Sequence, residues 1–291
     1  MRKCLLALLA LLFASGLSTA ARTQPAPHIA IWKVTGKVGT VYMFGSLHIL
    51  APATRWHDPR IGRVVREADT FYFEAPQDEA AVARLIAEEG FLPTGHSLRG
   101  ILPPKTRVKY DAALTALARP AADQDRLRPW LAQLFMLTLQ LKQAGLSGGV
   151  GVDKAIEREA RRQGKRVRYF ETLEQQLALL APDDPKRELE DFDSFLNDFA
   201  TQMADVPPMT NAWLTGDEAG LLRMTRKDFA GNDALRKAMI DDRNAAWVKT
   251  LKRVLDGEPG ATLVVVGAAH LVGEGGVPAL LRAAGYPVER L

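Results

Sequence analysis

The run Thr262-Leu263-Val264-Val265-Val266-Gly267-Ala268-Ala269-His270 decides the fold, because it joins a strongly apolar segment to a glycine and then to a histidine. Its β-branched residues are typical of a strand buried on both faces. The glycine permits a turn or a close backbone approach, so the Gly-x-x-His sequence places an imidazole just beyond the carboxyl end of the strand. Ligands of open α/β sheets bind at that edge, which makes His270 a candidate site residue.

The same pattern occurs near the start of the chain as Val41-Tyr42-Met43-Phe44-Gly45-Ser46-Leu47-His48. A single histidine at a strand end is most often a packed core or rim residue, whereas the repetition favours a shared function for His48 and His270. Segments so far apart in sequence meet only in the fold. The sequence therefore predicts that both histidines lie at one edge of a central sheet.

The remaining patterns predict an α/β fold of mixed α+β character, with a central mixed β-sheet flanked by helices. Residues 29–35 and 40–44 form an expected hairpin, and a largely helical insertion, about residues 79–255, separates the N-terminal from the C-terminal sheet segments. Further strands are expected at residues 70–76, 165–170 and 287–291. Helices are expected at residues 61–68, 130–144, 152–163, 173–180, 185–204, 215–224 and 277–284, with one long helix from a cap at Asn232 to about residue 255.

Residues 1–21 have the pattern of a signal peptide, with basic Arg2 and Lys3 before a short apolar core and small residues at the cleavage site. The apolar run is too short to span a bilayer, so we expect a periplasmic or secreted protein without a membrane anchor after leader removal. Cys4 precedes the apolar core, which argues against a lipid anchor. Residues 22–291 then form one predicted domain, since a chain with 47% apolar content can bury a full core.

The composition limits the available chemistry. Cys4 is the only cysteine and lies in the leader, so the mature chain has no disulfide, thiol nucleophile or thiolate ligand. Any metal must be held by histidine, carboxylate or carbonyl oxygen. The formal net charge is +4, and two of the basic residues belong to the leader. This near balance gives no reason to expect nucleic acid as a partner.

A third strand-end residue, Glu74, follows the apolar run Phe71-Tyr72-Phe73. Two histidines and one carboxylate suit zinc, manganese, iron or cobalt, with positions left open for water and substrate. The expected metal ligands are therefore His48, Glu74 and His270, with Glu74 as ligand or general base. Their side-chain tips should lie within roughly 5 Å of one another in one cleft, or reach that spacing by a rotamer change. Together with Arg243 they are also the expected catalytic residues.

Arg243 lies in the helix upstream of the second motif and should point into the same cleft, where it can hold a substrate carboxylate or an oxyanion. The alternative is a stem that lies over an apolar helix face with its head in water. Asp153 and Glu171 are weaker candidates, because Asp153 can serve as a helix cap and Glu171 directly precedes a capping threonine. These alternatives stay open at the level of the sequence.

The remaining motifs are weaker indications of a functional site. Gly145-Leu146-Ser147-Gly148-Gly149 matches a nucleophile elbow, but it follows a helix and is more typical of a helix end and loop. Residues 273–278 have a proline where the dinucleotide fingerprint requires glycine or alanine. His28, His57 and His96 lie in loops, and no pattern couples them to the histidine pair.

The chain resembles the TraB/GumN-like family, which includes the Tiki membrane-anchored metalloproteases. The resemblance covers nearly all of the mature chain, and it rests on an ordered set of short motifs: Phe44-Gly45-Ser46-Leu47-His48, Phe73-Glu74, Gly151-Val152-Asp153, Glu171 to Gln176, Ala212 to Asp217, Asp242-Arg243-Asn244, Val266 to Gly273 and Gly285 to Val288. It implies a fold like that of the haem-binding ChaN and erythromycin-esterase proteins. It also implies an active site made of the paired Gly-x-x-His motifs and the glutamate, and, from the Tiki branch, peptide cleavage that depends on manganese or cobalt.

Three hypotheses for the function follow. The first is an exported metal-dependent hydrolase, peptidase-like, which acts on a peptide or protein and uses a divalent ion such as manganese, cobalt or zinc. The second is a non-catalytic periplasmic protein that binds a ligand such as haem, or an envelope or polysaccharide-associated factor. A metal-free serine hydrolase that uses Ser147 is a distant third.

Overall fold

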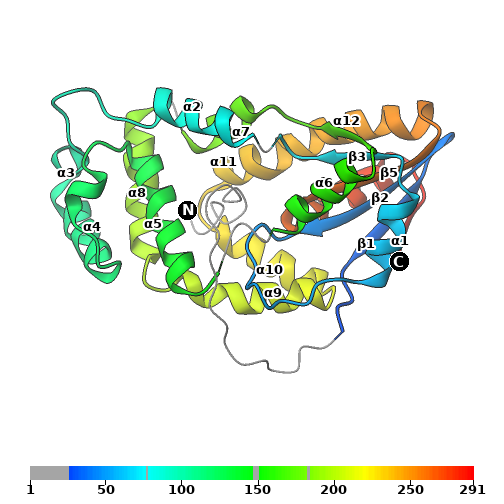
Figure 1. The fold of residues 1–291 in the computed structure, drawn as a ribbon, viewed down its shortest axis with the longest axis horizontal. Helices are drawn as coiled ribbons and strands as arrows, with labels where there is room; N and C mark the ends of the chain where they lie inside the picture. The colour runs from blue at the N-terminus through cyan, green and yellow to red at the C-terminus, as the bar shows by residue number, and fades with distance from the viewer. Residues whose placement is uncertain (1–25, 77, 147–150, 182–183) are drawn as a thin grey trace.

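The computed structural model describes residues 26–76, 78–146, 151–181 and 184–291 (Figure 1). Its sheet is mixed and has the strand order β4-β3-β5-β2-β1-β6. The strands are β1 (Ile31–Thr35), β2 (Gly39–Ser46), β3 (Thr70–Phe73), β4 (Arg166–Tyr169), β5 (Gly260–Gly267) and β6 (Val288–Arg290). The α/β class with a central mixed sheet is therefore confirmed.

The two strands that carry the Gly-x-x-His motifs, β2 and β5, are direct neighbours and run parallel. Their register pairs Phe44 with Val265 and Ser46 with Gly267, so both strands end at the same level. β3 pairs in parallel with the other side of β5. Because parallel strands end at one edge, the residues that follow β2, β3 and β5 emerge together.

Helices cover both faces of this sheet, as the alternation along β5 shows. Leu263 and Val265 pack into one apolar cluster with α1, α6, α9 and α10, whereas Val264 and Val266 pack into another with α12 and α13. These helices are α1 (Pro59–Glu67), α6 (Val152–Arg162), α9 (Val206–Leu214), α10 (Glu218–Asp228), α12 (Asp242–Gly257) and α13 (Val277–Ala283). A strand covered on both faces explains the nearly continuous apolar run.

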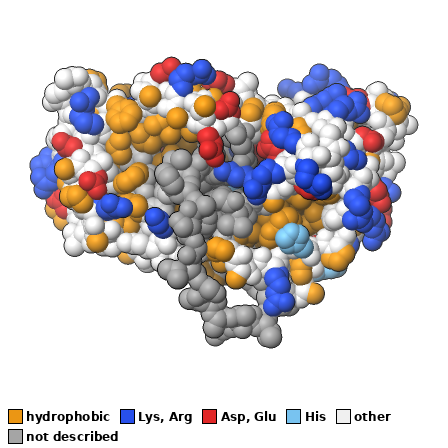
Figure 2. All heavy atoms as spheres, in the orientation of Figure 1, with side chains coloured by type: hydrophobic (Ala, Val, Ile, Leu, Met, Phe, Trp, Pro, Cys, Tyr) orange, Lys and Arg blue, Asp and Glu red, His pale blue; other side chains and the backbone are white. Residues whose placement is uncertain are grey.

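Only part of the expected helical insertion forms the other part of the molecule (Figure 1), because β4, α6, α9, α10 and α12 from the same range belong to the sheet or cover it. This part has an apolar cluster of its own, which joins α4, α5 and α8 and includes Ile49 from the segment after β2. Its elements are α2 (Glu79–Glu89), α3 (Leu98–Ile101), α4 (Pro104–Ala116), η2 (Ala121–Gln124), α5 (Pro129–Gln143), α7 (Leu173–Leu180) and α8 (Pro185–Asp198). Figure 2 shows apolar side chains gathered over the part that contains α5 and α8, with basic and acidic side chains interspersed elsewhere on this face.

Three helix predictions need correction. The long helix after Asn232 begins as expected, since the Asn232 side chain accepts a hydrogen bond from the Leu235 amide, but it consists of α11 (Asp233–Arg236), a π-helical turn η5 (Lys237–Asp241) and α12. The helix expected at residues 185–204 stops at Asp198 and is followed by η4 (Gln202–Asp205) and α9. The helix expected to begin near residue 215 begins at Glu218, because the Asp217 side chain caps it at the Gly220 amide.

The expected leader, residues 1–21, lies outside the described residues, so export stays a prediction. Among the residues that the structure does describe, no helix combines the length and the apolar character needed to cross a membrane.

Gly45 allows β2 to pass close to the turn after β5. A Cβ atom at Gly45 would lie 2.5 Å from the Cα atom of Ala268, which is backbone that cannot move without disturbing the site. We expect Gly45→Ala to lower the free energy of unfolding by about 1–3 kcal/mol. Urea unfolding measures this, with Gly257→Ala as the control, because a Cβ atom at Gly257 meets no atom within 4 Å. Equal stability of the two variants would contradict the prediction.

Candidate functional site

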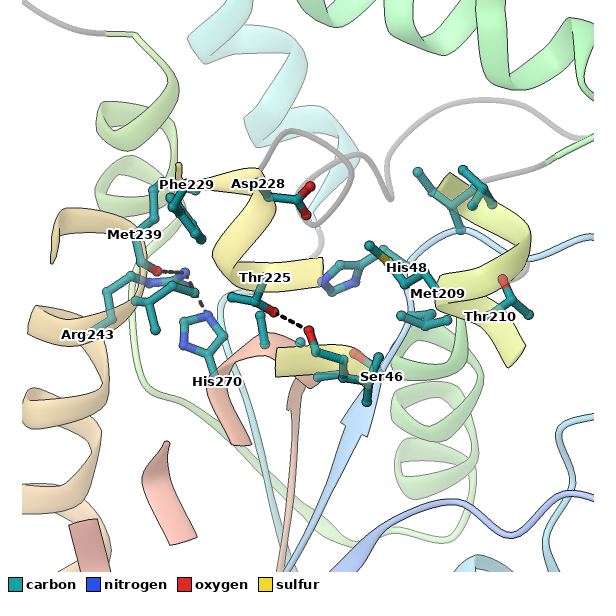
Figure 3. A pocket seen from close by; sticks show the side chains of 18 residues that line it. Ser46, His48, Met209, Thr210, Thr225, Asp228, Phe229, Met239, Arg243 and His270 are labelled. Atoms are coloured by element: carbon teal, nitrogen blue, oxygen red, sulfur yellow. Dashed lines mark hydrogen bonds between the residues drawn. The ribbon is translucent and has the colours of Figure 1, made fainter. Parts of the chain in front are cut away.

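The structure brings His48, Glu74 and His270 together at the carboxyl edge of the sheet, and both histidines line one cavity (Figure 3). A Cβ atom at Gly267 would lie 3.2 Å from Glu74 Oε1 and 3.7 Å from both His48 Nε2 and His270 Cδ2. His48 Nε2 and His270 Cδ2 are therefore separated by no more than twice 3.7 Å. His270 Nε2 lies 4.0 Å from Glu74 Oε1. The three residues thus lie at one edge of the sheet, and His270 and Glu74 have the expected spacing of roughly 5 Å or less.

His48 is held by a carboxylate. Its Nδ1 lies 3.0 Å from Asp153 Oδ2, and both side chains are buried. Burial by itself lowers the pKa of His48, but the charge of Asp153 and its hydrogen bond outweigh this and raise the pKa above the ordinary value. His48 Nε2 is buried, and within the described part of the chain it has no hydrogen-bond partner. Since Nδ1 faces the carboxylate, Nε2 carries the lone pair whenever the ring is neutral.

Asp153 reaches His48 because the chain before α6 lies close to the segment after β2. The Val152 amide donates to the Leu47 carbonyl (3.3 Å), and a Cβ atom at Gly151 would lie 2.9 Å from the His48 carbonyl oxygen. Asp153 is not the N-cap of α6, which is Gly151 with no side-chain cap. The cap interpretation of Asp153 is therefore wrong, and its carboxylate orients His48 instead.

His270 is a neutral imidazole with a fixed tautomer. The Asn244 amide nitrogen donates to the carbonyl oxygens of His270 and Gly275, so the Asn244 oxygen faces His270 Nδ1 at 2.7 Å and accepts a hydrogen bond from its N–H. His270 Nε2 then accepts a hydrogen bond from Arg243 Nη1 (3.1 Å). Burial, together with the positive charge of Arg243, lowers the pKa of His270 to about 3. This ring is consequently a poor base at neutral pH.

Arg243 is buried and uses all five of its N–H groups within the protein. Nε and Nη2 donate to the two oxygens of Glu171, Nη2 also donates to Glu74 Oε2 (2.6 Å), and Nη1 donates to the Met239 carbonyl and to His270. The guanidinium also lies over the Trp247 ring at 4.8 Å. The alternative in which its head lies in water is wrong. In this arrangement Arg243 positions the other site residues and has no N–H left for a substrate.

Glu74 accepts three hydrogen bonds. Its Oε1 accepts from the Gly267 amide (2.6 Å), and its Oε2 accepts from Arg243 and from Gln176 Nε2 (3.2 Å). Burial raises the pKa of Glu74, but the charge of Arg243 outweighs it and the pKa falls to about 2. A carboxylate with so low a pKa is a weak base, so Glu74 is a poor choice for the general base of a reaction near neutral pH.

Glu171 has a larger part in the site than the sequence indicates. It follows β4 as Glu74 follows β3, and the two strands are parallel neighbours, so the strand-end argument applied to it equally. Its Oε1 accepts from Trp247 Nε1 (2.8 Å) in addition to Arg243. Glu171 thus shares the guanidinium with Glu74, and two buried carboxylates depend on one cation.

The fit of a shared divalent ion can be judged from these donors. His48 Nε2 is an available ligand atom, but both oxygens of Glu74 and the Nε2 of His270 are engaged, chiefly with the Arg243 guanidinium. Among the described residues no group of three or more His, Cys, Asp or Glu side chains is arranged to hold a metal ion. To share an ion with His48 and Glu74, His270 Nε2 would have to leave Arg243 Nη1, so the divalent ion stays a prediction from the sequence.

The other candidates do not join the site. His57 stacks on Trp56 with ring centroids 4.2 Å apart, and neither His28 nor His96 lines the cavity. Ser147 and its elbow-like sequence lie largely outside the described residues. Gly273 and Gly276 belong to the turn between η6 (Ala268–Leu271) and α13, where the Gly276 amide donates to the Gly273 carbonyl.

The burial of His270 predicts a loss of stability in acid. Its pKa is about 3 in the fold and 6.5 in the unfolded chain, so between these values the unfolded state binds the extra proton. We expect the free energy of unfolding to fall below pH 6.5, with His270 contributing up to about 1.4 kcal/mol per pH unit. Glu74 adds to the loss below its ordinary pKa of 4.5.

Urea unfolding between pH 7 and 5 measures this effect. The variant His270→Gln, which keeps a hydrogen-bonding side chain but cannot titrate, should show a shallower decline. His48 has the opposite sign, because its raised pKa gives stability that is complete below pH 6.5 and is lost as the pH rises. A wild-type decline as shallow as that of His270→Gln would show that His270 is protonated in the fold.

The fold and the site define a class of α/β protein in which a mixed sheet, covered by helices on both faces, delivers two Gly-x-x-His histidines and a glutamate to one edge. The chain belongs to the TraB/PrgY/gumN family, whose family model matches residues 30–290. This confirms the family seen in the sequence motifs.

Two curated proteins are similar to part of the chain. Both are called "Uncharacterized protein YbaP", one from Escherichia coli (strain K12) and one from Shigella flexneri. Each is 29% identical over 153 residues, which is 53% of this chain and 56% of the relative. The chain thus spans about half the length of the curated relatives it matches. No solved structure matches.

Proposed function

We propose that the protein is a hydrolase of amide or ester bonds, in which His48 is the general base. The observation that carries this proposal is the buried Nε2 atom of His48, which has no hydrogen-bond partner in the described chain, on a residue that lines the cavity and whose Nδ1 is held by Asp153. An imidazole oriented by a carboxylate and open at its other nitrogen is an arrangement that activates water or a hydroxyl.

The other side chains support this assignment by elimination. The pKa of Glu74 is about 2 and that of His270 about 3, so both are weak bases near neutral pH. The pKa of His48 is raised, which gives its neutral form the strongest proton affinity of the three. In the proposed reaction His48 Nε2 takes a proton from a water as the water oxygen attacks the carbonyl carbon, and Asp153 stabilises the imidazolium that results. The imidazolium then gives this proton to the departing amine or alcohol as the amide or ester bond breaks.

Arg243 has a positioning role in this scheme. It neutralises Glu74 and Glu171 and holds the His270 ring through Nε2. The family resemblance favours a peptide or protein as substrate and a location outside the cytoplasm, and we keep both as parts of the proposal. A divalent ion, which the resemblance also implies, stays a prediction from the sequence, and no step of the scheme depends on it.

The experiment is a hydrolysis screen of the purified protein with peptide and ester libraries, run with and without a chelator. We expect a hit that survives chelation, is lost in His48→Gln and is weakened in Asp153→Asn. Activity retained in His48→Gln would overturn the proposal. Activity that requires added manganese, cobalt or zinc, with metal bound by wild type but not by His270→Ala, would instead support the metal-dependent form.

A haem-binding role has less support. His270 Nε2 is already engaged with Arg243, and the cavity beside the histidines is about 100 Å³, well below the roughly 300–1,000 Å³ of typical cofactor sites. A Soret band that appears when wild type is titrated with haem, and that is absent in His48→Ala, would support haem binding.

A further inference from the structure

The cavity beside the histidine pair has mostly apolar walls (Figure 3). His48, Arg243 and His270 line it, and so do apolar side chains from α9, from α10 and its C-cap, and from the π turn η5. These apolar side chains are Val206, Met209, Leu221, Phe229, Met239 and Ile240. We call this cavity the apolar subsite.

The polar side chains at the apolar subsite are mostly committed elsewhere. Thr225 donates its hydroxyl to the Leu221 carbonyl (3.0 Å), and Arg243 uses its five N–H groups within the protein. Asp228 is buried and takes part in a further interaction. The Ser46 hydroxyl and His48 Nε2 are buried and have no hydrogen-bond partner among the described residues. These two polar atoms are therefore the ones left to meet an incoming group, and the rest of the cavity favours apolar contact.

The π turn η5 links the apolar subsite to the chemical groups. It contributes Met239 and Ile240 to the cavity wall, and the Met239 carbonyl accepts a hydrogen bond from Arg243 Nη1. π-helical turns inside α-helices occur frequently at functional sites, because the extra residue displaces side chains and frees a backbone group. Here one turn both forms the wall and fixes the guanidinium.

We propose that the apolar subsite binds an aliphatic group of the substrate, next to the bond that faces His48. The apolar subsite has a volume of about 100 Å³. Because a cavity of about 150 Å³ holds benzene, we expect by proportion a group of roughly four carbon atoms. In a peptide this corresponds to a side chain such as leucine or methionine. The proposal rests on the proposed function for the reaction but not for the binding.

Binding can be tested without any reaction. The probes are straight-chain primary amides of two to eight carbon atoms, titrated into the purified protein by calorimetry or protein-observed NMR. We expect the affinity to rise about fourfold per added methylene until the chain fills the cavity, and then to level off. Met209→Phe should move the plateau to a shorter chain, and Met209→Ala should move it to a longer chain.

Met224→Ala is the matched control, because Met224 lies on α10 but is not among the described residues that line the cavity. It should leave the plateau unchanged. Affinities that do not depend on chain length, or a plateau that neither Met209 variant moves, would overturn the apolar subsite. His48→Gln should keep the chain-length dependence while losing hydrolysis. If the dependence holds but no hydrolysis is ever found, the proposed function fails and the apolar subsite stands.

Discussion

Replacing Arg243 by methionine should lower the free energy of unfolding by about 3–5 kcal/mol, the range for removing one partner of a buried ion pair. Methionine fills much of the space but leaves Glu74 and Glu171 buried without their shared cation. Both carboxylates must then be protonated or hydrated, and each alternative disturbs the packing around Trp247 and His270. We therefore expect this variant to be the most destabilising single replacement of a charged residue at the site.

Urea unfolding at neutral pH measures the loss. Arg253→Met is the matched control, because Arg253 lies on the same helix α12, is exposed and donates to Thr250, so it should change the stability by less than about 0.5 kcal/mol. The double variant Arg243→Met/Glu171→Gln should recover part of the loss, since one of the two uncompensated charges is gone. A loss below about 1 kcal/mol in Arg243→Met would show that the two carboxylates do not depend on it.

Replacing His48 by glutamine should reduce kcat/KM by about 10²–10⁴, the usual contribution of a general base, while the stability changes little. Glutamine can still donate a hydrogen bond to Asp153, so the buried carboxylate keeps a partner in this variant. Because the neutral imidazole is the active form and its pKa is raised, the wild-type activity should rise with pH through a midpoint above 6.5. In Asp153→Asn this midpoint should move to a lower pH.

Activity of the His48 variant is measured on the substrate identified in the screen, and circular dichroism reports its fold. His57→Gln is the control for loss of a histidine, because His57 stacks on Trp56 outside the cavity. A midpoint that does not move in Asp153→Asn would show that His48 is not the titrating group.

The sequence determined the sheet and the position of its functional edge. Residues 262–267 and 41–46 have patterns that only a buried strand satisfies well, and each ends in Gly-x-x-His, so the placement of His48 and His270 followed from local patterns. Glu74 followed for the same reason. Strand and helix periodicities are local properties of the chain, and that is why these predictions agree with the structure.

The partners of these residues were decided by the tertiary structure. Nothing in the neighbourhood of Arg243 in sequence shows that it serves both Glu74 and Glu171, and nothing local distinguishes Asp153 as a helix cap from Asp153 as the partner of His48. The sequence also does not indicate the π turn before Arg243, because the flanking residues are compatible with a continuous helix.

The physical reason is that such choices depend on burial and charge balance among segments far apart in the chain. A carboxylate that is carried into the interior must meet a cation or several N–H donors, and the fold determines which donors lie within reach. The sequence therefore determined which side chains reach the edge of the sheet. The tertiary structure decided that Arg243 lies between Glu74 and His270, and that His48 lines the cavity.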